Sequence, residues 1–80
     1  MTPAERLGLR TGILTRCKTS ADAQHDALRA FHTGQLMRRE PSPNIQAAAA
    51  WESLADILWR RAERLESKEE RERIKKETGL

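Results

Sequence analysis

SPNIQAAAAWESLADILWRRAERL, residues 42–65, is the stretch that decides the fold of this 80-residue chain. Ser42 followed by Pro43 is a typical helix start, with serine as the N-cap and proline as the first helical residue. The apolar residues that follow recur at helical intervals along two adjacent lines, which are Ala47, Trp51, Leu54, Leu58 and Leu65, and Ile45, Ala48, Ala55, Trp59 and Ala62. This spacing predicts one long helix that runs toward Thr78 and has a broad apolar face, wide enough for more than one neighbouring helix.

The segment that follows Leu65 is almost entirely charged and reads ESKEERERIKKE over residues 66–77. Glu69 precedes Arg73 by four positions, an order that stabilises a helix with little tertiary packing. We therefore expect residues 1–65 to form one small helical domain and residues 66–80 to be a charged helical extension or a frayed tail. The sequence leaves open whether the helix is continuous through Ser67.

The segment before the long helix predicts two shorter helices. Thr2 and Pro3 are an N-cap and a first helical residue, and the helix that they start is expected to reach Cys17. The next helix begins at Thr19 or Ser20. Its expected apolar line comprises Ala21, Ala27 with Leu28, Phe31 and Leu36.

Two breaking signals offer alternative ends for this second helix. It ends at Gly34, or it continues to Arg39 with a weak point at the glycine. The motif Glu40-Pro41-Ser42-Pro43 then breaks the chain, because a residue before proline is driven out of the helical region.

The fold class expected from these elements is all-α. The sequence has 38% hydrophobic residues, 11 alanines and no valine or tyrosine, a composition that favours helices over strands. We expect two short N-terminal helices packed on one long C-terminal helix. Because the short helices cannot cover its whole apolar face, we also expect the chain to dimerise through the long helix.

The net charge of +3 lies entirely in the first helical segment. Its basic residues are Arg6, Arg10, Arg16 and Lys18, and elsewhere acidic and basic residues balance. These four residues are the candidate contacts for a polyanion. A helix-turn-helix interpretation is disfavoured, because Asp22 and Asp26 would lie in the turn that approaches the nucleic acid.

Residue patterns for catalysis, metal binding and membrane insertion are missing from the sequence. His25 and His32 are seven positions apart, roughly 10 Å along a helix, which is too far to share a metal ion. Asp22, His25 and Asp26 fit a capping charge and a solvated face better than a cation site. No run of ten apolar residues and no secretion signal occurs. We expect a cytoplasmic non-enzyme without cofactor, metal, small-molecule substrate or membrane contact.

Trp51 and Trp59 are the most informative residues for function. They lie eight positions apart, so their side chains point about 80° apart around the helix. Two interpretations are open: both tryptophans belong to the core, or one belongs to the core and the other faces outward. Tryptophan is enriched at binding interfaces. The predicted dimer or partner interface comprises Trp51, Leu54, Leu58, Trp59 and Leu65.

The leading hypothesis for function is a noncatalytic protein-interaction module. We expect a small homodimeric regulator or inhibitor, of a bacterial, phage or mobile-element type, that binds itself and another protein. One alternative is a nucleic-acid-binding regulator that uses its basic first helix. The other is a structural adaptor subunit of a larger assembly.

Overall fold

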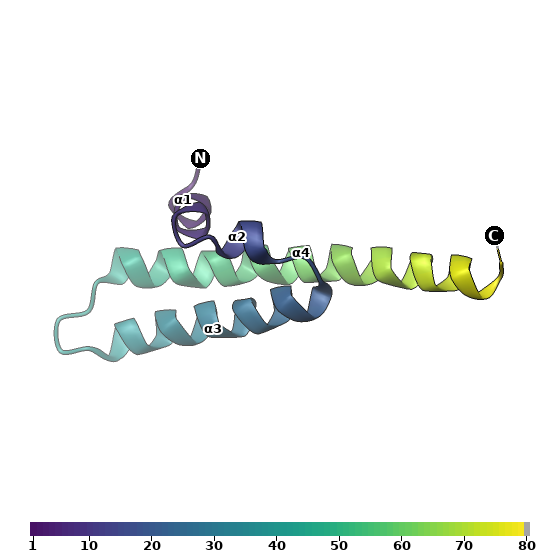
Figure 1. The fold of residues 1–80 in the computed structure, drawn as a ribbon. Coiled ribbons are helices and arrows are strands. Elements are labelled where there is room, and N and C mark those ends of the chain that lie inside the picture. The colour runs from purple at the N-terminus through teal and green to yellow at the C-terminus, as the bar shows by residue number, and fades with distance from the viewer. Residues whose placement is uncertain (80) are drawn as a thin grey trace.

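The computed structural model describes residues 1–79 and consists of four helices. These are α1 (Pro3–Arg10), α2 (Ile13–Arg16), α3 (Ser20–Arg39) and α4 (Ile45–Glu77). Helices α3 and α4 form an antiparallel hairpin, and α1 and α2 lie on one side of α4 (Figure 1). No strand occurs among the described residues. The predicted all-α class, with shorter helices packed on a long C-terminal helix, is confirmed.

Side-chain caps fix the starts of three helices. The Thr2 hydroxyl accepts a hydrogen bond from the Glu5 amide at 3.2 Å, as the sequence predicts. The predicted start of the long helix is wrong, because Asn44 is the N-cap and accepts from the Ala47 amide at 3.0 Å. Asparagine is as good an N-cap as serine, and the helix therefore begins two residues later than predicted.

The prediction of one N-terminal helix reaching Cys17 is also wrong. Gly12 has a left-handed backbone with φ of 74°, which separates α1 from α2. Just before it, the Thr11 hydroxyl donates to the Leu7 carbonyl at 2.8 Å and completes the end of α1. Glycine adopts this conformation without the clash that a Cβ would introduce, so the chain turns at this residue.

Helix α3 continues through Gly34 to Arg39, and it packs with a different face from the predicted one. Leu28, Phe31 and Leu36 of the predicted apolar line are exposed. The buried line consists of Ala23, Ala27, Ala30 and Gly34. These small residues bring α3 close to α4, where Ala48, Ala55 and Ala62 are also buried.

The few large core residues lie where α1 and α2 cover α4. Leu54 and Leu58 are fully buried, and Ile13, Leu14 and Trp51 pack against the same cluster. Gly8 of α1 permits this contact, because a Cβ at Gly8 would lie 2.6 Å from Leu14 and 2.9 Å from Leu54 side-chain atoms. The core is therefore a thin layer of alanine with leucine concentrated beneath α1.

Helix α4 is continuous through Ser67 and ends at Glu77, followed by Gly79 with φ of 73°. Near its distal end the Glu69 carboxylate accepts hydrogen bonds from the Ser20 hydroxyl and, at 3.3 Å, from the Ser20 amide. Beyond Glu69, α4 extends past the start of α3 (Figure 1). The last residue of the predicted 66–80 extension, Leu80, lies outside the described residues.

Candidate interaction site

The five residues of the predicted interface occupy three different environments. Leu54 and Leu58 are fully buried inside a single chain. Trp51 and Leu65 are half-buried and pack against the same core, whereas Trp59 is 41% exposed. The structure therefore does not bring these five residues together on one surface, because α1 and α3 cover the centre of the apolar face of α4.

Two large apolar side chains of α3 join Trp59 on the surface of the hairpin. Leu28 is 58% exposed and Phe31 is 50% exposed. We call Leu28, Phe31 and Trp59 the aromatic face. The sequence predicted an apolar line that contained Leu28 and Phe31 together with Ala21 and Ala27, and of these four residues only Ala27 is buried.

The contacts of Glu52 indicate that Phe31 and Trp59 share one side of the hairpin, and Leu28 lies three residues before Phe31 on α3. Glu52 in α4 accepts hydrogen bonds from Gln35 at 3.3 Å and from Arg38 at 2.6 and 2.9 Å. Phe31 lies one helical turn from Gln35, and Trp59 lies two turns from Glu52, so all four residues point to the same side. The antiparallel register places Phe31 across from the part of α4 that carries Trp59.

The ion pair of Arg38 and Glu52 forms one end of this face. The Arg38 Nε and Nη2 atoms each donate to a different oxygen of Glu52, which is a bidentate arrangement. This hydrogen bonding lowers the pKa of Glu52 and raises the pKa of Arg38. The charges of Arg38 and Glu52 therefore compensate each other at this end of the face.

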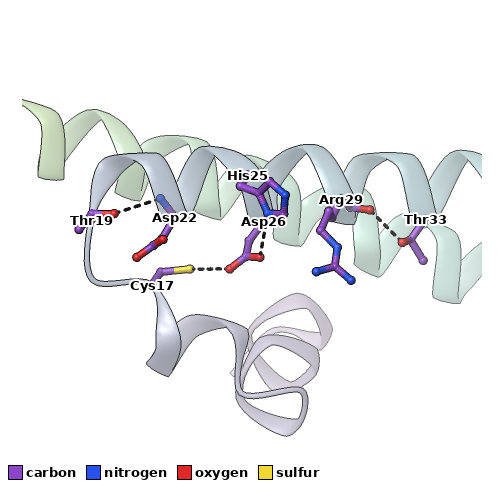
Figure 2. Close-up of polar contacts among 7 residues, drawn as sticks. All are labelled: Cys17, Thr19, Asp22, His25, Asp26, Arg29 and Thr33. Atoms are coloured by element: carbon purple, nitrogen blue, oxygen red, sulfur yellow. Dashed lines mark hydrogen bonds and ion pairs between the residues drawn. The ribbon is translucent and has the colours of Figure 1, made fainter.

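The opposite side of the hairpin holds the only cysteine, Cys17. Its thiol is 1% exposed and donates a hydrogen bond to Asp26 Oδ2 at 3.1 Å, as Figure 2 shows. The Arg61 guanidinium donates to the Cys17 carbonyl oxygen at 3.0 Å and links α4 to the same point. Burial, followed by the hydrogen bond to Asp26, raises the pKa of the Cys17 thiol to about 11.

This environment makes the Cys17 thiol a structural group. A thiol with a pKa of about 11 is protonated at neutral pH, and the thiolate is the form that acts as nucleophile. Neither the sequence position of Cys17 nor that of Asp26 revealed their contact, because α2 and the turn after it bring the two residues together. Cys17 therefore joins α2 to α3.

The basic residues predicted to contact a polyanion lie on the surface, and three of them line two depressions. Arg6, Arg10, Arg16 and Lys18 are all exposed. Arg6 and Arg10 line a shallow depression between α1 and the first turns of α4. Arg16 lines a separate depression that also contains the acidic residues Asp22 and Asp26.

Metal binding, membrane insertion and similarity to known proteins complete the description of the chain. Within residues 1–79, no three His, Cys, Asp or Glu side chains gather in a way that could hold a metal ion. In the same part of the chain, no helix combines the length and the apolar character needed to cross a bilayer. Comparison with models of protein families, with curated proteins and with solved structures finds no match.

Proposed function

We propose that this chain is a noncatalytic protein-interaction module that self-associates through the aromatic face. The observation that carries the proposal is the distribution of large apolar side chains. Leu54 and Leu58 are the only large aliphatic or aromatic residues with no exposure among residues 1–79, whereas Leu28, Phe31 and Trp59 are each at least 41% exposed. Aromatic side chains grouped on a surface are typical anchors of protein interfaces.

The composition of the aromatic face favours a second copy of the same chain as its occupant. Gln24 and Gln35 lie one turn beyond Leu28 and Phe31 on the same side of α3, and both are uncharged. The charges of Arg38 and Glu52 compensate each other at one end. Two identical faces can approach around a two-fold axis, with the exposed Asp56, which pairs with Arg60 at 3.0 Å, and the exposed Glu63 at the rim, one turn on either side of Trp59.

A dimer formed in this way leaves other surfaces free for a further protein. Helices α1 and α2 cover one side of α4, and the distal end of α4 projects past the start of α3 (Figure 1). None of Leu28, Phe31 and Trp59 belongs to α1, to α2 or to that projecting end. Binding of another protein there suits the role of a small regulator or inhibitor. The proposed dimer differs from the predicted one, which used α4 alone. It uses Trp59 of α4 together with Leu28 and Phe31 of α3.

Sedimentation velocity over a hundredfold concentration range tests the proposal. We expect the parent chain to sediment with twice its mass of 9.1 kDa. The double variant Phe31→Gln/Trp59→Gln is expected to be a monomer with unchanged helix content. The matched control is Leu36→Gln, because Leu36 is 48% exposed and lies about 200° around α3 from the buried Gly34. A monomeric parent, or a double variant that remains dimeric, would contradict the proposal.

A further inference from the structure

A line of basic side chains follows the distal half of α4. Because the helix is continuous from Ile45 to Glu77, residues at intervals of three and four lie on one side of it. Five basic residues have this spacing, and all five are exposed. We call them the basic edge, and they are Arg60, Arg64, Lys68, Arg71 and Lys75.

The basic edge faces away from the rest of the hairpin. Ala55 and Ala62 are buried against α3, and Glu69 contacts Ser20 at the start of α3, so these three residues define the inner side of α4. At about 100° per residue, the basic edge is centred roughly half a turn away from that side. With the same angle of about 100° per residue, every acidic side chain between residues 57 and 77 lies outside the sector of α4 that holds the basic edge.

This segregation of charge opposes the stability of the isolated helix. Arg60 with Arg64, Arg64 with Lys68, and Arg71 with Lys75 are like-charge pairs four residues apart. Each pair of this kind destabilises a helix by about 0.2–0.5 kcal/mol, whereas an acidic residue at either position would stabilise it. Within the chain, Arg60 pairs with Asp56 at 3.0 Å, and Glu72 lies within one turn of Lys68 and Lys75. Arg64 and Arg71 have no acidic residue three or four positions away, so an anionic partner would relieve the repulsion there.

We propose that the basic edge binds the phosphate backbone of a nucleic-acid duplex. Its length from Arg60 to Lys75 is about 22 Å at a rise of about 1.5 Å per residue. One strand of a duplex has a phosphate about every 3.4 Å along the axis, so the edge spans roughly six phosphates. The edge carries only arginine and lysine as binding groups, and this composition predicts binding without sequence preference.

The surroundings of the edge favour nucleic acid over other anionic partners. Residues 60–75 have no apolar side chain along the edge itself, whereas a helix that binds a membrane surface inserts an apolar face.

Fluorescence anisotropy with a labelled DNA duplex of two helical turns, titrated with the full chain, tests this proposal. Five phosphate contacts predict a slope of about −4 to −5 for the logarithm of affinity against the logarithm of salt concentration. The test variant is Arg71→Gln/Lys75→Gln, and its matched control is Arg73→Gln/Lys76→Gln. The control removes one arginine and one lysine from the same segment, but on other sides of α4.

The test variant is expected to bind at least about tenfold more weakly at 0.1 M salt and to reduce the slope by about 2. The control is expected to stay close to the parent. Equal losses in both variants, or no binding of the duplex at 50 mM salt, would overturn the proposal. So would tighter binding to phosphatidylserine vesicles or polyglutamate. The same titration with a labelled RNA duplex shows whether the chain prefers the phosphate backbone of DNA or that of RNA.

Discussion

Gly34 of α3 lies against the backbone of Ala48 in α4. A Cβ at Gly34 would be 3.0 Å from the Ala48 carbonyl oxygen and 2.9 Å from Cγ of Glu52. The separation of the two long helices is therefore set by the smallest side chains of α3. This close approach turns the large side chains, including Phe31, out toward solvent.

Gly34→Ala is expected to destabilise the protein even though alanine is the better helix former. The added methyl group gains about 1 kcal/mol of helix propensity but must displace a backbone carbonyl. We expect the free energy of unfolding to fall by about 1–2 kcal/mol, measured by urea denaturation. Ser67→Ala, at an exposed position of α4, is the control and should be neutral or stabilising. A more stable Gly34→Ala variant would show that the helices can separate at little cost.

Leu54→Ala is expected to remove a core contact within a single chain. Leu54 is fully buried, and truncation of a buried leucine costs about 2–5 kcal/mol. Leu36→Ala serves as the control, because Leu36 is 48% exposed and its truncation should change the free energy of unfolding by less than about 0.5 kcal/mol. The free energy of unfolding of each variant is to be measured by urea denaturation at the same protein concentration. Similar effects of the two substitutions would contradict the difference in burial between Leu54 and Leu36.

The Cys17 thiol is expected to make stability depend on pH above neutrality. Its pKa is raised from 9.0 to about 11 in the folded chain, so the folded state binds this proton more tightly than the unfolded state does. The resulting contribution of about 2–3 kcal/mol is fully present below pH 9 and is lost as the pH rises from 9 to 11.

The measurement for Cys17 is the free energy of unfolding between pH 8 and pH 11, obtained under reducing conditions. Cys17→Ser is the control, because a serine hydroxyl does not titrate in this range. The parent should lose more stability than Cys17→Ser over this interval. Parallel curves for the two proteins would show that the thiol has its ordinary pKa.

Glu69 is expected to stabilise the start of α3 from across the hairpin. Its carboxylate accepts hydrogen bonds from the amide and hydroxyl of Ser20, at the positive end of the α3 dipole. Glu69→Gln should lower the free energy of unfolding by about 0.5–1 kcal/mol and increase amide exchange in the first turn of α3. The matched control is Glu70→Gln, because Glu70 neighbours it in sequence but does not bond to Ser20. Equal effects would assign the loss to net charge alone.

Local sequence signals determined where most helices of this protein begin and end. Thr2 caps α1, Thr19 caps α3 and Gly79 follows the end of α4, because each signal acts through hydrogen bonds or backbone angles within a few residues. The long amphipathic pattern after Pro43 likewise predicted the longest helix. At the start of α4 the sequence contains two suitable capping residues, Ser42 and Asn44, and Asn44 is the one that caps the helix.

Tertiary packing decided which faces of the helices are buried and which remain for partners. A helical pattern shows that Phe31 and Ala27 lie on different sides of α3, but their distance from α4 depends on how closely the two helices approach. Gly34 and the alanines permit a close approach, so Ala27 is buried and Phe31 is exposed. The contact of Cys17 with Asp26 likewise depends on α2 and the turn that follows it. The sequence by itself determined that these helices form. The distance between α3 and α4 determined which of their faces are buried and which are exposed, and that distance depends on many contacts between residues far apart in the sequence.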